Sequence, residues 1–440
     1  MNRLFREIDN APLVVFRIFL GFLLACETFG AILTGWVKSN MADVKFTFSH
    51  IGMEWLQPLP GTGMYWYFAA MGILGLLVML GYKYRLSIGL FTLLWAGSYF
   101  MQKTSYNNHY YLLLLVCFIM LFLPAHRYAS LDAKLDPGIK RLTMPAWCSW
   151  IMIAQVSIVY FYATVAKFYP DWLDGTFTRD LLERSVTNHG LREFMTQKWF
   201  YLFIAYAGIA FDMLVVPLLL YKKTRTMALI ASVIFHIFNS ITLQIGIFPF
   251  FALSFVVFFY PPEKIRQVFL RKKPVVAGYG FSSEGANILK YVFAPYLAVQ
   301  LLLPLRHHVI EGDVLWTEEG HRLSWRMMLR SRSGDTDFRV MDKKTGQRLF
   351  YDLSRNLTHK QKNNMEAHPD MIWQMAQRIR EHFTKQGQDV AVYADTHVSV
   401  NNGPYRRLID PDIDLASAKW NYFSHCSWIL LYENHRKDIP

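Results

Sequence analysis

The sequence predicts a mainly α-helical fold, in which a membrane bundle of about nine spanning helices (residues 1–304) precedes a smaller extracytoplasmic α+β domain (residues 305–440). Three observations predict it. Hydrophobic residues make up 53% of the 440 residues and charged residues only 18%, whereas soluble domains carry about 25% charged residues. Apolar runs near the ~20 residues that cross a bilayer recur up to residue 303. Beyond that point the chain becomes mixed and charged.

The predicted spans follow from these apolar runs, of which the third, fourth and eighth are short. They are Ala11–Trp36, Met64–Gly81, Leu86–Phe100, Tyr110–Pro124, Ala146–Ala166, Tyr201–Leu220, Thr226–Leu243, Gly246–Tyr260 and Asn287–Leu303.

The basic residues predict the orientation, because short cytoplasmic loops of membrane proteins collect Lys and Arg. One set of loops carries 16 of them, among them Lys83, Arg127 and Lys264, and the opposite set carries 7. We therefore expect a multi-pass membrane protein with a cytoplasmic N-terminus and a periplasmic or extracellular tail, lumenal in a eukaryote. The loops also account for the net charge of +13, so we expect no nucleic acid as a partner.

The tail reads as α+β. Leu323–Arg330, Asp337–Met341, Arg348–Leu353 and Asp389–Val400 alternate like strands, with turns expected at residues 333–335 and 345–346. Residues 358–386 predict one helix, with Ile372, Met375, Ile379 and Phe383 on one side.

Ionisable residues inside a bilayer are costly and are therefore candidates for function. Lys167 ends the fifth span, on the same helical face as Ser157, Tyr160 and Thr164. It is either a lysine that extends to the membrane interface or a base, because low-dielectric surroundings favour the free amine.

His109 lies at the external mouth of the fourth span, beside Asn107 and Asn108, and the predicted topology brings it near the same membrane face as Lys167. His236 and Asn239 share one face in the middle of the seventh span. For His109 the alternative to a functional site is an ordinary polar loop turn. For His236 and Asn239 it is a polar network between helices, which would also account for Arg17, Glu27 and Asp212.

The sequence has no phosphate-binding glycine loop, no H-E-x-x-H motif and no cysteine pair at zinc spacing. The histidines and acids between Arg306 and His321 fit no metal template. We therefore expect no metal.

Four segments carry a resemblance to a known family. They are Val15–Phe22, Lys103–His109 (KTSYNNH), Val165–Trp172 (VAKFYPDW) and Trp325–Ser333 (WRMMLRSRS). The chain resembles the vitamin K-dependent gamma-carboxylase family, whose membrane part is called the HTTM domain, and looks like a short, bacterial-type member of it.

The resemblance implies a reaction. In that family a lysine base deprotonates reduced vitamin K, and the product reacts with O₂ to form a strong base that takes a γ-proton from a glutamate, which then captures CO₂. The implied cofactor is a menaquinol- or phylloquinol-type quinol, with O₂ and CO₂ as co-substrates. The implied partners are membrane lipid, the quinol and a glutamate-containing peptide or protein.

The resemblance also implies roles for individual residues. Lys167 matches the catalytic lysine, and His109 is the second catalytic candidate. The matched segments imply substrate-binding roles for Asn107, Asn108, His236, Asn239, Met327, Met328 and Arg332.

The sequence departs from the family in three ways. The animal enzymes have a longer external region, the family's external disulfide has no counterpart because we expect no external partner for Cys426, and Leu323 stands where the family has an aromatic residue. Quinol epoxidation is therefore better supported than carboxylation. The alternatives are a lipid- or quinone-binding protein or transporter without chemistry, and a scaffold for the tail.

Overall fold

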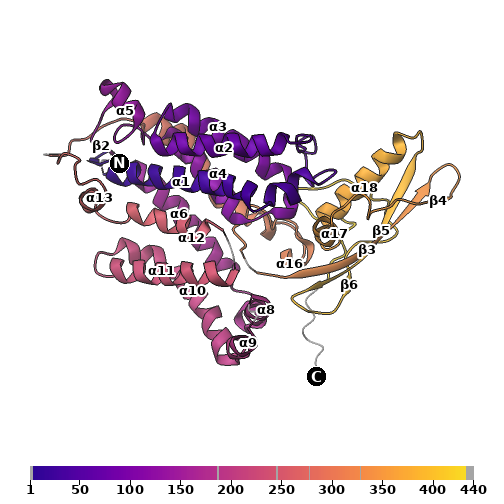
Figure 1. Cartoon of the computed structure of the whole chain (residues 1–440). Helices are drawn as coiled ribbons and strands as arrows, with labels where there is room; N and C mark the ends of the chain where they lie inside the picture. The colour runs from indigo at the N-terminus through magenta and orange to yellow at the C-terminus, as the bar shows by residue number, and fades with distance from the viewer. Residues whose placement is uncertain (1–2, 186–187, 244–245, 277, 328, 433–440) are drawn as a thin grey trace.

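The structure is a computed structural model that describes residues 3–185, 188–243, 246–276, 278–327 and 329–432. A helical bundle carries a smaller domain, the tail, at one end, and the N-terminus lies at the other end (Figure 1). This confirms the predicted class, a helical membrane bundle followed by an α+β domain. The helices that make up the body of the bundle are α1 (Ala11–Leu33), α2 (Gly63–Leu80), α3 (Tyr84–Met101), α4 (Asn108–Phe122), α6 (Trp147–Ala166), α10 (Lys198–Leu220), α11 (Arg225–Leu243), α12 (Phe248–Ser254) and α15 (Ala294–Leu302).

Six described helical segments are long and apolar enough to cross a membrane, and Asn108–Phe122 and Phe248–Phe258 are shorter apolar helices. The number nine stays a prediction. The six are Ala11–Leu33, Gly63–Leu80, Trp147–Ala166, Lys198–Leu220, Arg225–Thr242 and Ala286–His308.

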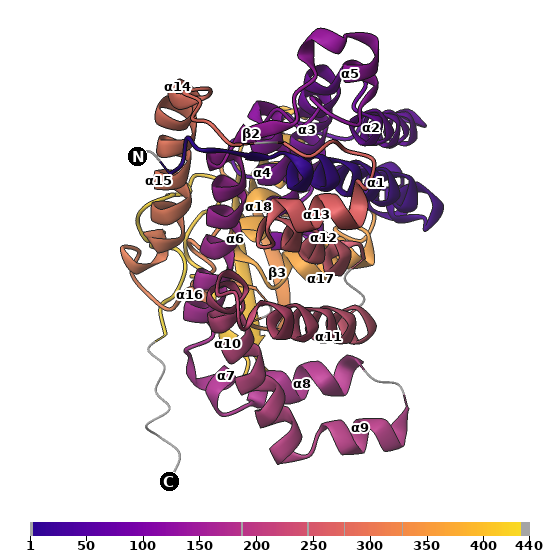
Figure 2. The ribbon, with the colours of Figure 1, turned by 90° about the vertical axis from the view of Figure 1, so that its left-hand side faces the viewer.

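Short elements close the two ends of the bundle. Near the N-terminus lie α5 (Leu131–Leu135), α13 (Pro262–Phe269) and the strand pair β1 (Glu7–Asp9) and β2 (Thr143–Pro145), and α14 (Ala286–Ile288) leads into α15. Toward the tail lie α7 (Pro170–Leu173), α8 (Thr176–Ser185) and α9 (His189–Met195). Figure 2, which looks along the bundle, shows α6 near its middle, α14 and α15 at one edge, and α8 and α9 at another.

Glycine lets α1 and α2 pack closely. A Cβ added to Gly21 would lie 2.2 Å from the backbone nitrogen of Met79, and one added to Gly75 would lie 2.7 Å from that of Ala25. Small residues at such crossings are typical of membrane helices, because association there depends on close backbone approach.

The tail is an antiparallel sheet covered by a helix. Its strand order is β4 (Arg348–Leu349), β3 (Arg332–Asp342), β5 (Val390–Val400) and β6 (Arg406–Arg407), and β3 pairs with β5 from Arg332↔Val400 to Asp342↔Val390. The helices are α16 (Val314–Thr317), α17 (His359–Met365) and α18 (Pro369–Thr384).

The predicted apolar face of α18 is confirmed, since Ile372, Met375, Ile379 and Phe383 are all buried in the tail core. The same core contains Phe46 and Phe48, which belong to the loop after α1. The tail therefore packs directly onto the bundle.

Three local predictions in the tail were wrong. Of Leu323–Arg330, the described residues, 323–327 and 329–330, form no strand, because Leu323 and Trp325 have φ of 62° and 57°, which a strand excludes. Residues 333–335 lie inside β3 and form no turn. The single helix of residues 358–386 is two helices, because His368 is extended before Pro369, as the residue preceding a proline usually is.

Candidate functional site

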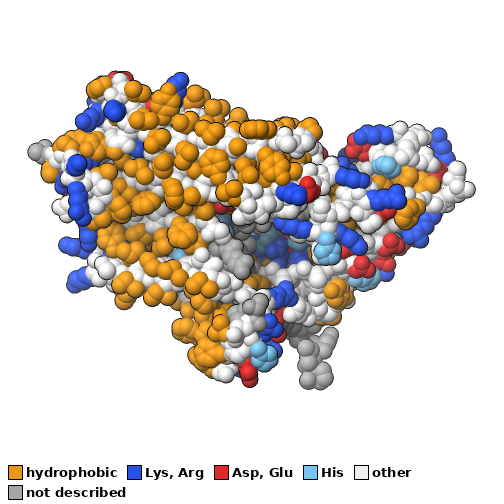
Figure 3. Space-filling model, in the orientation of Figure 1, with side chains coloured by type: hydrophobic (Ala, Val, Ile, Leu, Met, Phe, Trp, Pro, Cys, Tyr) orange, Lys and Arg blue, Asp and Glu red, His pale blue; other side chains and the backbone are white. Residues whose placement is uncertain are grey.

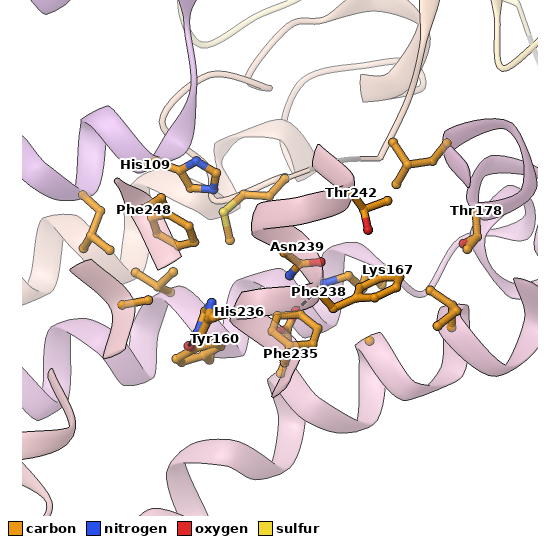
Figure 4. A pocket seen from close by; sticks show the side chains of 18 of the residues that line it. His109, Tyr160, Lys167, Thr178, Phe235, His236, Phe238, Asn239, Thr242 and Phe248 are labelled. Atoms are coloured by element: carbon orange, nitrogen blue, oxygen red, sulfur yellow. Dashed lines mark hydrogen bonds and ion pairs between the residues drawn. The ribbon is translucent and has the colours of Figure 1, made fainter. Parts of the chain in front are cut away.

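A cavity of about 140 Å³ lies inside the bundle, near its tail end. Side chains of α4, α6, α8, α10, α11 and α12 line it (Figure 4), and Met327 of the tail also belongs to the lining. The walls are mostly apolar, as in most small-molecule sites. The polar or titratable side chains that line it are His109, Tyr160, Lys167, Thr178, Asp212, His236, Asn239 and Thr242.

Lys167 enters this cavity from the end of α6. The helix ends at Ala166, a few residues before Pro170, because a proline cannot continue a helix. The Lys167 side chain forms an ion pair and hydrogen bond with Asp212 of α10, and its Nζ lies 5.2 Å from the centre of the Trp172 ring. Lys167 is 7% exposed and Asp212 is 6% exposed, so the pair is almost fully removed from solvent.

His236 and Asn239 line the cavity from α11, on the one face that their spacing predicts. His236 is 2% exposed, its Nε2 lies 3.4 Å from the Tyr160 hydroxyl, and its Nδ1 has no hydrogen-bond partner among the described residues. A buried polar atom without a partner is uncommon and calls for an explanation. The Nδ1 of His236 is therefore a candidate hydrogen-bonding group for a guest in the cavity that His236 lines.

His109 lines the cavity from the first turn of α4. Its ring stacks on that of Phe248, with the ring centres 3.6 Å apart and an angle of 15° between the planes. Figure 4 shows the two imidazoles on one side of Asn239 and Lys167 on the other. The cavity thus has an amine and a carboxylate at one side and two imidazoles with aromatic neighbours at the other.

Of the remaining predicted residues that the structure describes, Met327 lines the cavity and Asn107, Asn108 and Arg332 do not. Asn107 caps α4 by accepting a hydrogen bond from the backbone nitrogen of Tyr110 at 2.7 Å. Asn108 donates to the Arg326 carbonyl at 3.2 Å. The Arg332 guanidinium donates to the carbonyls of Ala367, Leu315 and Trp316 inside the tail. Met328 lies outside the described residues.

Two of the membrane ionisable residues have partners elsewhere. Arg17 donates to the carbonyls of Ala125 and Ala129, and Glu27 accepts from the Tyr110 hydroxyl at 2.5 Å. Glu27 fits the predicted network between helices, whereas the carbonyls that Arg17 bonds lie in the loop after α4. Asp212 differs, because its partner is Lys167 in the cavity.

The sequence therefore assigned Asp212 to a network and missed its pairing with Lys167. The available signal was its charge, since Asp212 is the one carboxylate within α10. The aromatic wall, with Phe235 stacked on Phe211 at 3.9 Å, and the contribution of α8 through Thr178 and Leu182 had no signal in the sequence. Among the described residues, no group of three or more His, Cys, Asp or Glu side chains could hold a metal ion.

Two family models match the chain, one over the bundle and one over the tail. The first, described as the HTTM domain, covers residues 5–263. The second, described as the vitamin K-dependent gamma-carboxylase, lumenal domain, covers residues 285–435. No solved structure matches the chain significantly. The two models cover both parts of the molecule in order, and the chain belongs to the vitamin K-dependent gamma-carboxylase family.

Proposed function

We propose that the protein is a membrane enzyme that uses Lys167 as a base to deprotonate a vitamin K-type quinol, so that the quinol reacts with O₂ and is epoxidised. The observation that carries the proposal is the burial of the Lys167–Asp212 pair in a cavity that two imidazoles also line. Family membership supports a quinol, because the family is vitamin K-dependent.

The residues of the cavity fit a quinol headgroup. The ring is planar and apolar with a hydroxyl group at each end. Phe248 and the other aromatic walls suit the ring, and the Nδ1 of His236 suits a hydroxyl. His109 and Asn239 line the same space and supply further hydrogen-bonding groups. When bound, the quinol would supply a reduced ring whose reaction with O₂ yields the strong base that, in carboxylation, removes the γ-proton of a glutamate.

Lys167 and Asp212 together hold the proton that the reaction moves. Two unlike charges in a dry site lose much of their hydration, so a neutral amine beside a neutral carboxylic acid competes with the ion pair. With the proton on Asp212, the Nζ of Lys167 has a free lone pair and accepts a hydroxyl proton. The apolar walls exclude water, which would otherwise supply competing protons.

Carboxylation of a glutamate with CO₂ is the second half of the proposal. It is supported by the match of the tail to the lumenal domain of the carboxylases. The acceptor would be a glutamate-containing peptide or protein that reaches the cavity from the tail side, past Met327. In this proposal residues 1–304 form the membrane domain and residues 305–440 the extracytoplasmic domain, with the N-terminus cytoplasmic.

The test is to incubate the purified protein with reduced vitamin K and O₂ and to measure the epoxide by chromatography. We expect the parent to form epoxide and Lys167→Ala to form it at least ~10²-fold more slowly, since proton transfer by a positioned base contributes about that much. Lys198→Ala, at an exposed lysine of α10, is the matched control and should behave like the parent. Equal rates in Lys167→Ala and the parent would refute the proposal that Lys167 is the base.

A second assay separates epoxidation of the quinol from carboxylation of a glutamate. The same reaction receives a glutamate-containing peptide and labelled bicarbonate, and the label in the peptide is counted. Label that depends on Lys167 supports carboxylation, whereas epoxide without label limits the enzyme to epoxidation. Quinone binding without either product would identify a lipid-binding protein, for which the apolar cavity alone would suffice.

A further inference from the structure

A buried ion cluster joins the bundle to the tail. The Nζ of Lys103, in the turn Lys103–Ser105 before α4, lies 2.7 Å from Asp370 Oδ2, and Arg322 Nε lies 3.2 Å from the same oxygen. Lys103 is 2% exposed and Asp370 6%. Burial by itself raises the pKa of Asp370, but Arg322 and Lys103 outweigh it and hold that pKa well below its usual range. Asp370 therefore stays ionised at neutral pH.

The two cations of this cluster belong to two loops that are hydrogen-bonded to each other. On the bundle side, the Tyr106 hydroxyl accepts from the backbone nitrogen of Leu323 at 2.7 Å and donates to Asn108 at 3.0 Å. Asn108 donates in turn to the carbonyl of Arg326 at 3.2 Å. The guanidinium of Arg322 lies 5.1 Å from the centre of the Tyr106 ring. Residues 103–108 and 322–326 thus form one seam, anchored by Asp370.

Each of the two loops of the seam leads directly into the cavity. His109 follows Asn108 on the bundle side, Met327 follows Arg326 on the tail side, and both side chains line the cavity. A shift of either loop would therefore move a wall of the cavity.

The tail side of the seam is held in an unfavourable conformation. Leu323 and Trp325 have φ of 62° and 57°, a region that residues with a Cβ rarely adopt. Trp325 is fully buried and stacks on Tyr111 of α4, with the ring centres 4.8 Å apart. Such strain persists only where surrounding contacts impose it, and it is concentrated at functional sites.

We propose that Asp370 is a positioning residue for the quinol reaction: it binds Lys103 and Arg322 together, so that His109 and Met327 close the cavity. The inference rests on the proposed function. Asp370 and the two cations that it binds are not among the described residues that line the cavity, so Asp370 acts through the two loops.

The experiment compares Asp370→Asn with Val392→Ala in the full chain. Asp370→Asn keeps the side-chain volume and removes the charge that holds both cations. Val392 is fully buried in the tail core on β5, away from the seam, so Val392→Ala lowers tail stability without touching the two loops. Tyr106→Phe, which removes the hydroxyl between Leu323 and Asn108, probes the same seam if Asp370→Asn fails to fold.

Two readouts are taken below the unfolding temperature of every variant: hydrogen exchange by mass spectrometry, and the kcat and KM of quinol epoxidation. We expect Asp370→Asn to speed exchange in peptides covering 103–109 and 320–327 together, with kcat at least ~10-fold lower and a higher KM for quinol. Val392→Ala should leave exchange in both peptides and both kinetic constants as in the parent.

The proposal is overturned if Asp370→Asn leaves exchange in the two peptides unchanged, or if Val392→Ala alters exchange and kinetics as strongly. Hydrogen exchange needs no turnover. A parent that forms no epoxide would therefore refute the proposed function, while the exchange data would still decide whether Asp370 holds the two loops.

Discussion

At the residue scale, the pairing of Lys167 with Asp212 organises the candidate site. A lysine alone in an apolar cavity would lack a group to which it could pass a proton, whereas Asp212 supplies one directly. The sequence identified Lys167, His109, His236 and Asn239, because charged and polar groups are conspicuous in apolar spans. It could not identify the pair, because 45 residues separate Lys167 from Asp212 and only helix packing brings them together.

Asp212→Asn tests the pair. The variant keeps the shape of the side chain but cannot hold the proton, so we expect the epoxide rate to fall about 10-fold or more while quinol still binds. Glu27→Gln is the matched control, because Glu27 is another carboxylate in a membrane helix and bonds Tyr110 instead of a cavity residue. The measurement is the epoxide rate at saturating quinol. A parental rate in Asp212→Asn would show that Lys167 works without this partner.

At the element scale, periodicity predicted regular helices and strands well and irregular segments badly. The apolar face of α18 follows directly from residue spacing. Residues 323–330 alternate like a strand, but contacts with the bundle hold the described part, residues 323–327, in another conformation. The Tyr106 hydroxyl accepts a hydrogen bond from the backbone nitrogen of Leu323, and Trp325 stacks on Tyr111. Contacts between distant elements decide such a segment, and a single sequence does not contain them.

The crossing of α1 and α2 gives a prediction about stability. Gly21→Ala places a methyl group 2.2 Å from the Met79 nitrogen, so the helices must separate. We expect a loss of about 1–3 kcal/mol, the usual cost of overpacking, measured as a lower thermal unfolding midpoint in detergent. Gly30→Ala on the same helix meets no atom within 4 Å and should leave the midpoint nearly unchanged. Equal midpoints for the two variants would contradict the close packing.

At the scale of the whole molecule, the orientation in the membrane stays a prediction. Figure 3 shows Lys and Arg side chains at the end of the bundle opposite the tail, and others on the tail and at its junction with the bundle. The loop charges predict that the end opposite the tail is cytoplasmic, since they set membrane orientation. Loop charges do not reveal that Phe46 and Phe48, in a loop of the bundle, pack in the tail core.

Thiol labelling tests the orientation. The variants are made in a Cys26→Ser background, which removes the exposed native cysteine. Gln347→Cys reports the side of the membrane on which the tail lies, and Lys134→Cys reports the side on which the opposite end of the bundle lies. Both positions are exposed. With an impermeant thiol reagent on intact cells, we expect Gln347→Cys to react and Lys134→Cys to react only after lysis. The reverse pattern would place the tail in the cytoplasm.

The central claim is that the amine of Lys167 is the base, and chemical rescue tests it most directly. Lys167→Ala leaves a space beside Asp212 that a small primary amine can occupy. The measurement is the epoxide rate of this variant against the concentration of added amine. We predict that the rate rises with the neutral amine and that Lys198→Ala does not respond. A Lys167→Ala variant as fast as the parent without added amine would contradict the account.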